Sequence, residues 1–185
     1  MATREKFRWQ FVGYICEVFG LMIWVGGLLM IIAVVIPAVF NSFSMEQGGR
    51  FLRRVFDGYS LLTLGILLFL LVMVSLRYWQ TAGSSQMLFP VTRTEVLLLL
   101  GMAMITSVIM GIVGPKTIAL QEQAFEAVGE LEKKTAYDQF FRMHMISRAL
   151  YLVNVGLAAG LLVSKLRRVL VSWYTSREHM QNISS

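Results

Sequence analysis

Long apolar runs separated by short polar segments dominate this chain. Four runs reach the roughly 20 residues that a helix needs to cross a bilayer. None of them alternates between apolar and polar positions as a membrane β-strand does. The runs cover about residues 18–40, 59–76, 96–113 and 146–163. The pattern therefore predicts an all-α fold, a polytopic bundle of four transmembrane helices that forms a single domain over residues 1–185.

The polar segments beside these runs predict further helical structure outside the bilayer. The residues after Pro115 stay helix-forming, so we expect the third and fourth helices to extend outside the bilayer and to meet in a hairpin. Residues 50–57 have the apolar and basic faces of a short interfacial helix. Residues 164–185 combine an apolar stripe with basic residues, which predicts an amphipathic cytoplasmic tail on the anionic leaflet. No internal repeat of the kind that marks many transporters is evident.

Composition supports a lipid environment. The chain is 56% hydrophobic and 15% charged, with a mean hydropathy of +0.63, so a soluble domain with a charged surface is excluded. The net charge of +6 comes from basic residues beside apolar runs, which favours lipid headgroups over nucleic acid as the partner. The single cysteine, Cys16, excludes an intrachain disulfide and a cysteine-based metal cluster.

The charge distribution predicts the orientation. With the N-terminus inside, Lys and Arg are slightly more numerous on the inner side, as the positive-inside rule requires. Trp9, Trp79 and Trp173 then form an aromatic belt on that same side. The first apolar run is too long for a cleavable signal, so we expect it to remain as a helix. We predict a multi-pass protein of the inner or plasma membrane with both termini cytoplasmic.

Glycines mark two candidate helix-packing surfaces. Gly13, Gly20 and Gly27 recur every seven residues and share one side of the first helix. Gly156 and Gly160 form a small-xxx-small pattern on the fourth helix. Small residues let helix backbones approach closely in lipid. The alternative is the ordinary abundance of glycine in membrane helices.

Charged residues within or near the spans predict ion pairs. Arg148 lies just inside the fourth run, and Asp57 begins the second at the same outer level, so the two are candidate partners. A structural pair and a transport role for Arg148 remain equally open. Glu17 is at the inner end, where Arg77 or Lys165 suits it better as a partner.

The segment around His144 is the one candidate metal site. Thioether and imidazole ligands suit Cu(I), and Met143 and Met145 flank His144. Consecutive helical residues point about 100° apart, so a copper site needs a further ligand from another helix, such as Met110. Methionine as flexible core filler is the alternative. A bis-His haem is excluded because His179 lies on the opposite side of the membrane, and no other cofactor is predicted.

Several short motifs resemble a known family, the transmembrane protein 205-like domain family of four-helix membrane proteins. They are Trp24-Val-Gly-Gly27, Pro37-Ala-Val-Phe40, Gly114-Pro115-Lys-Thr117 and Phe141-x-x-His144-x-x-Ser147 with Asn154. The resemblance implies the four-helix fold and no settled activity, and a functional His-x-x-Ser motif would map onto His144 and Ser147. The Trp-x-Gly-Gly…Pro part is also similar to the membrane domain of the copper-resistance D family, which implies copper handling.

Two functions follow from these features. The first is a non-catalytic integral membrane protein, an accessory or structural subunit of a membrane complex or a homo-oligomer, with lipid and other membrane helices as partners. The second is a small transporter of copper or another solute with an outer-side site around His144. A membrane enzyme ranks third, because the chain has no Ser/His/Asp set, no HExxH and no Gly-rich phosphate loop.

Overall fold

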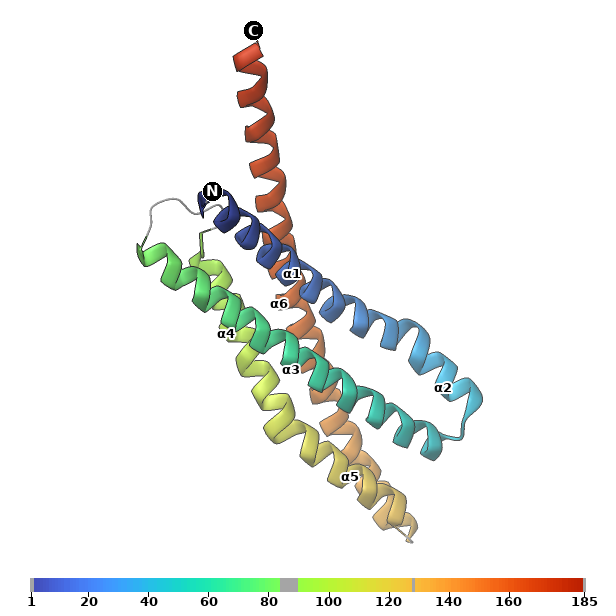
Figure 1. The fold of residues 1–185 in the computed structure, drawn as a ribbon. Coiled ribbons are helices and arrows are strands. Elements are labelled where there is room, and N and C mark those ends of the chain that lie inside the picture. The colour runs from blue at the N-terminus through green and yellow to red at the C-terminus, as the bar shows by residue number, and fades with distance from the viewer. Residues whose placement is uncertain (1, 84–89, 128, 185) are drawn as a thin grey trace.

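The computed structural model of the chain is built from helices alone. It describes the backbone of residues 2–83, 90–127 and 129–184, and side chains over residues 8–79, 90–127 and 129–171. Helices make up 95% of the chain, and the described part contains no strand, which confirms the all-α fold. In chain order the helices are α1 (Ala2–Met30), the π-helix η1 (Ile31–Val35), α2 (Ile36–Ser42), α3 (Met45–Gly83), α4 (Arg93–Val108), the π-helix η2 (Ile109–Val113), α5 (Gly114–Glu126) and α6 (Glu130–Ser184) (Figure 1).

Four stretches of helix are long and apolar enough to cross a membrane, so the chain is a multi-pass membrane protein. Each stretch contains one of the predicted runs. They are Arg8–Ser42, Met45–Trp79, Arg93–Glu126 and Glu130–Val171. Residues 50–57 belong to the start of α3 and do not form a separate interfacial helix, because α3 continues through Gly58 into the span without a break.

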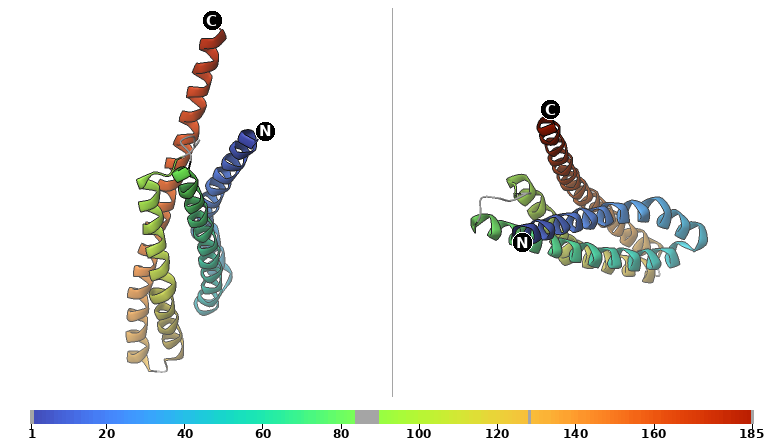
Figure 2. Two further views of the ribbon diagram at one scale, coloured as in Figure 1. Left: turned by 60° about the vertical axis from the view of Figure 1, so that its left-hand side comes forward. Right: turned by 45° about the horizontal axis from the view of Figure 1, so that its top comes forward.

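The chain folds as two helical hairpins. In the first, α1, η1 and α2 run out and α3 returns. In the second, α4, η2 and α5 run out and α6 returns. Both termini lie at one end of the bundle, and the last part of α6 extends beyond it on that side (Figures 1 and 2). α1 and α4 each contact both return helices, α3 and α6.

Each outgoing helix passes through a proline by means of a π-turn. Proline cannot donate a backbone hydrogen bond, and its ring crowds the preceding turn. In the first hairpin the Ile36 amide donates to Ile31 O, just before Pro37. In the second the Gly114 amide donates to Ile109 O, just before Pro115. The wider turn lets the helix continue past the proline at the cost of a local distortion.

The outgoing helices of the two hairpins repeat one another. A constant spacing of 78 positions relates the π-turns (31 to 109), the prolines (37 to 115) and a glutamate in each hairpin (17 to 95). The same spacing relates the buried positions 21, 24, 28 and 31 of the first hairpin to 99, 102, 106 and 109 of the second, all of which are buried. The expectation of no internal repeat was therefore wrong. Few residues are identical between the two halves. The repeat is recognised instead by the matching buried positions and the matching π-turns.

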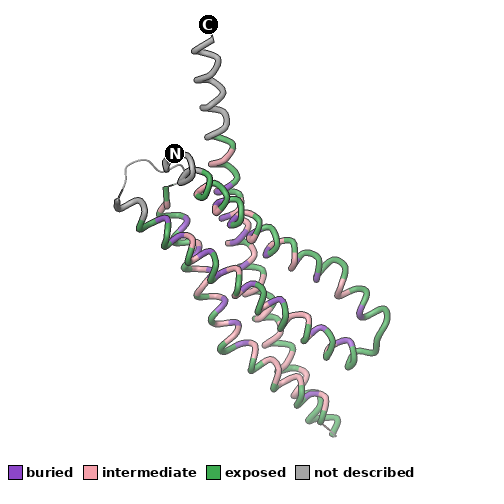
Figure 3. The backbone as a smooth tube through the Cα atoms, in the orientation of Figure 1, coloured by how far each residue is buried: buried purple, intermediate pink, exposed green. Residues whose placement is uncertain are grey.

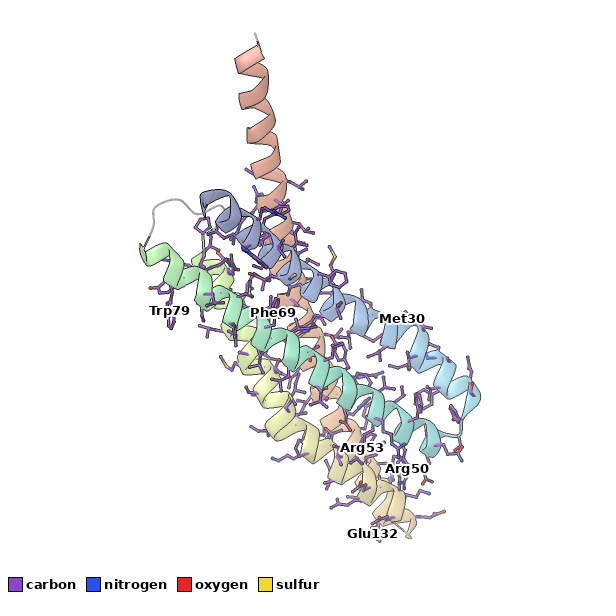
Figure 4. The ribbon with its side chains drawn as sticks, viewed as in Figure 1. Met30, Arg50, Arg53, Phe69, Trp79 and Glu132 are labelled. Atoms are coloured by element: carbon purple, nitrogen blue, oxygen red, sulfur yellow. The ribbon has the colours of Figure 1, made fainter. Side chains whose placement is uncertain are left out.

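The bundle is thin, so its core is narrow and its outside is apolar. Leu21, Trp24, Leu70, Met102 and Leu161 are among the fully buried residues at its centre. Figure 3 shows that buried positions recur along the helix sides that face one another, while the outer sides are exposed. Met30, Phe69 and Trp79, labelled in Figure 4, are exposed apolar side chains. A lipid solvent accounts for this apolar outside.

Candidate functional site: a buried charge ring and a polar cavity

Four charged side chains form a closed ring inside the end of the bundle that holds the termini. Glu17 comes from α1, Arg77 from α3, Glu95 from α4 and Lys165 from α6. Each hairpin thus contributes one carboxylate on its outgoing helix and one cation on its return helix. We call these four residues the charge ring.

Each cation of the charge ring binds both carboxylates. Arg77 Nη2 donates to Glu17 Oε2 at 2.8 Å and to Glu95 Oε1. Lys165 Nζ donates to the same two oxygens, at 2.5 Å each. The side chains of Glu17, Glu95 and Lys165 are completely buried, and that of Arg77 is 6% exposed. The prediction that Arg77 or Lys165 pairs with Glu17 is confirmed, and both do.

Two further residues complete the surroundings of the ring. Arg168 donates to Glu95 Oε2 at 3.2 Å and to Thr92 Oγ1 at 2.6 Å. The ring of Tyr14 covers the cations, with its centroid 5.5 Å from Arg77 Cζ and 4.7 Å from Lys165 Nζ. Aromatic faces attract cations, so Tyr14 stabilises the positive half of the cluster.

The carboxylates of the ring are not equivalent. Both oxygens of Glu95 accept hydrogen bonds from cations, whereas Glu17 Oε1 is buried and receives none from a described residue. An unpaired charge at this depth would cost several kcal/mol. The cluster avoids most of that cost because its cations and carboxylates satisfy one another, and in doing so it ties together all four spanning helices.

A small polar cavity lies further along the bundle, near the midpoints of the spans. The cavity is lined from all four spans by Trp24, Tyr59, Ser60, Thr63, Thr106, Ile109, Met110, Tyr151, Asn154 and Val155. Asn154 is about 16 Å along α6 from Lys165 at 1.5 Å per residue. Buried apolar residues, including Leu21, Leu70 and Leu161, occupy the layer between the cavity and the charge ring.

Hydrogen bonds between helices surround this cavity. The Tyr59 hydroxyl donates to Trp24 O at 2.8 Å, and Ser60 Oγ lies 2.8 Å from the Tyr151 hydroxyl. Asn154 Nδ2 donates to Thr106 Oγ1 at 3.0 Å. Sequence reasoning missed these contacts. The available signal was a set of hydroxyl and amide side chains near the centres of otherwise apolar spans.

The predicted copper ligands do not gather around one point. His144 is half-buried and stacks on Phe140, with ring centroids 5.5 Å apart. Met145 is 46% exposed, whereas Met110 lines the polar cavity. That cavity includes Asn154, about 15 Å from His144 along α6. No group of three or more His, Cys, Asp or Glu side chains suited to a metal occurs among the described residues. Copper binding at Met143, His144 and Met145 stays a prediction.

Arg148 and Asp57 are both exposed, and no ion pair joins them in the described part of the chain. The ion pair that links the hairpins at the end of the bundle opposite the termini is a different one. Arg53 Nη1 lies 2.8 Å from Glu122 Oε1 of α5, and Arg50 lies over the ring of Phe125. Figure 4 shows Arg50 and Arg53 on the end of α3 that lies beside α5.

The two glycine sets have different surroundings. A Cβ at Gly13, Gly20 or Gly27 would lie 2.4 Å from Met73 Cε, 3.3 Å from Ile66 Cγ2 and 3.1 Å from Tyr59 Cε2, respectively. All three neighbours belong to α3, so this seam lies at the α1–α3 contact. Gly156 and Gly160 are exposed, and nothing lies within 4 Å of a Cβ built at either.

Residues 19–126 match a family described as a domain of unknown function, DUF4149. The chain belongs to the DUF4149 family. The matched segment holds Arg77 and Glu95, while Glu17 and Lys165 lie outside it. No curated protein and no solved structure matches this DUF4149 chain. The match does not support the resemblances to the transmembrane protein 205-like and copper-resistance D families, and it assigns no activity.

Proposed function

We propose that this chain is a non-catalytic integral membrane protein, acting as an accessory or structural subunit of a membrane complex or as a homo-oligomer. The charge ring is the observation that carries the proposal. Its carboxylates and cations bind one another across all four spans, and they are buried. A carboxylate held by two fixed cations is a poor base or nucleophile, because its charge is already stabilised. The ring therefore acts to fix the helices in one arrangement.

The exposed glycines of α6 supply the contact surface for this role. Gly156 and Gly160 are open to the outside, and exposed Leu152 and Val163 lie near them on the same helix. Small residues flanked by aliphatic ones allow another helix to approach closely in lipid. The surface fits a second copy of the chain or a helix of another subunit.

Cysteine cross-linking in native membranes tests the proposal. Gly156→Cys is introduced after Cys16→Ser has removed the native cysteine, and Gly65→Cys on α3 is the matched control. Gly65 is also exposed with nothing within 4 Å of a built Cβ. A dimer cross-linked at position 156 and not at position 65 supports a homo-oligomer. A specific adduct with another protein supports an accessory subunit. A monomer with neither product, in membranes and after mild extraction, refutes the proposal.

Solute handling is the second candidate, and the polar cavity is the observation that favours it. Polar side chains at mid-span are costly and commonly serve a pathway. The version centred on His144 predicts bound copper, while a version centred on the cavity predicts a solute that Asn154 contacts. Flux of small neutral solutes into proteoliposomes, lost in Asn154→Leu, would support it, and equal flux through empty liposomes would count against it.

A further inference from the structure

The lining of the polar cavity includes a buried polar atom that has no hydrogen-bond partner in the described part of the chain. Asn154 is 5% exposed and lines the cavity, and its Oδ1 accepts no hydrogen bond from any described residue. Leaving a buried carbonyl oxygen without a donor is unfavourable, because the oxygen loses its hydrogen bonds to water and gains none in return. The amide nitrogen of the same side chain donates to the Thr106 hydroxyl oxygen on α4. The oxygen therefore marks a place for a hydrogen-bond donor.

The other cavity hydroxyls point to the same conclusion. The Tyr59 proton is committed to Trp24 O, and the Thr63 proton is committed to Ser60 O at 3.0 Å. Each of these oxygens keeps lone pairs that can accept. The Ser60–Tyr151 contact uses one hydroxyl proton of the two. The cavity lining therefore holds several oxygens that can still accept a hydrogen bond.

The size and charge of the cavity narrow the class of ligand. The cavity has room for about one water molecule. A buried water molecule is stable where two to four polar partners surround it. The lining of the cavity contains no Asp, Glu, His, Lys or Arg. A neutral donor fits such a lining better than a metal cation, for which no charged ligand is present.

In the internal repeat, the position equivalent to Thr106 is apolar. Thr106, which accepts the bond from Asn154, corresponds in the repeat to Leu28 of the first hairpin. Both positions are buried, and Leu28 belongs to the apolar core. The second hairpin thus has a polar residue, Thr106, where the first hairpin has the apolar Leu28.

We propose that the mid-span cavity is a binding site for one water molecule, held by Asn154 Oδ1 and by the neighbouring hydroxyl oxygens of Tyr59 and Thr63. The water donates to acceptors that the protein leaves unfilled and links helices from both hairpins. The site is distinct from the charge ring, which an apolar layer separates from it. The assignment holds for either of the two proposed functions.

Radiolytic hydroxyl labelling of the full chain in lipid nanodiscs tests the site. Water bound beside a side chain yields hydroxyl radicals on X-ray exposure and labels that side chain even where it is buried. Trp24, 1% exposed and in the cavity lining, is the reporter, and Trp79, 76% exposed, is the positive control. Met102 is completely buried outside the cavity lining, so it reports labelling that does not depend on the site.

We expect Trp24 to be labelled in the wild type while Met102 is not. In Thr106→Val/Asn154→Leu, which replaces both polar partners by apolar groups of similar shape, labelling of Trp24 falls several-fold and that of Trp79 is unchanged. Thr106→Leu, which copies the residue of the first hairpin, serves if the double variant does not fold. Unlabelled Trp24 in a wild type whose Trp79 is labelled overturns the proposal. Undiminished Trp24 labelling in a folded variant also overturns it.

Discussion

Removing one carboxylate of the charge ring is the most direct test of its role. In Glu95→Gln, Arg77, Lys165 and Arg168 all lose a charged acceptor, and Glu17 alone remains to balance three cations. Breaking a buried ion pair by removing one partner costs about 3–5 kcal/mol. Because three cations are affected, we expect Glu95→Gln to cost about 4 kcal/mol, roughly a thousandfold in the unfolding equilibrium.

The assay is reversible unfolding in lipid–detergent micelles, followed by circular dichroism and tryptophan fluorescence. Glu46→Gln is the matched control, because Glu46 pairs with Arg50 at 3.2 Å but both side chains are more than half exposed. An exposed i,i+4 pair contributes about 0.3–0.5 kcal/mol. If Glu95→Gln costs no more than Glu46→Gln, the ring does not hold the bundle together and the reasoning fails.

A double variant separates lost pairing from lost packing. Glu17→Gln/Lys165→Met removes one carboxylate and one cation, so the excess positive charge of the cluster stays as in the wild type. We expect the double variant to cost less than the sum of its single variants by about 2 kcal/mol, the coupling typical of residues in one network. Additive costs would mean that Glu17 and Lys165 act independently, against the 2.5 Å contact between them.

Three further outcomes are expected. Gly27→Ala destabilises by about 1–3 kcal/mol, because its Cβ lies 3.1 Å from the Tyr59 ring, whereas Gly26→Ala, with open space at its Cβ, leaves the midpoint of thermal unfolding unchanged or slightly higher. Tyr59→Phe removes the buried bond to Trp24 O and costs about 1 kcal/mol in the same unfolding assay. If copper binds at His144, metal analysis of copper-loaded, reduced protein gives a stoichiometric loss of copper in His144→Ala, and equal copper in the wild type and the variant would refute that prediction.

Hydropathy was sufficient to predict the four spans, because the length and continuity of an apolar run determine whether a helix crosses a bilayer. Depth along the membrane could also be predicted. Glu17, Arg77 and Lys165 lie at matching distances from the ends of their spans, so their pairing follows from the sequence. The depth of a residue does not determine how its helix is rotated about its own axis, and therefore does not tell which residues it faces. For this reason the place of Glu95 in the charge ring could not be predicted from the sequence.

The unknown rotation of the helices also explains why the predictions for Arg148, Asp57 and Met110 differ from the structure. Arg148 and Asp57 lie at similar depth, but the rotation of α6 and α3 leaves both exposed. Met110 was paired with His144 by its position near the outer end of a span. The structure places it instead in the cavity beside Asn154, because the π-turn at Ile109–Val113 and the packing of α4 against α6 set its level and direction.

The distribution of the charge ring over the two hairpins has a consequence for how the protein enters the membrane. Glu17 pairs with Arg77 inside the first hairpin, and Glu95 pairs with Lys165 inside the second. Each hairpin therefore contains its own counter-ion when it leaves the ribosome and moves sideways into lipid. The cross-pairs, Arg77 with Glu95 and Lys165 with Glu17, form only when the second hairpin arrives. Insertion one hairpin at a time therefore requires no stage at which a charge-ring residue is buried without an oppositely charged partner.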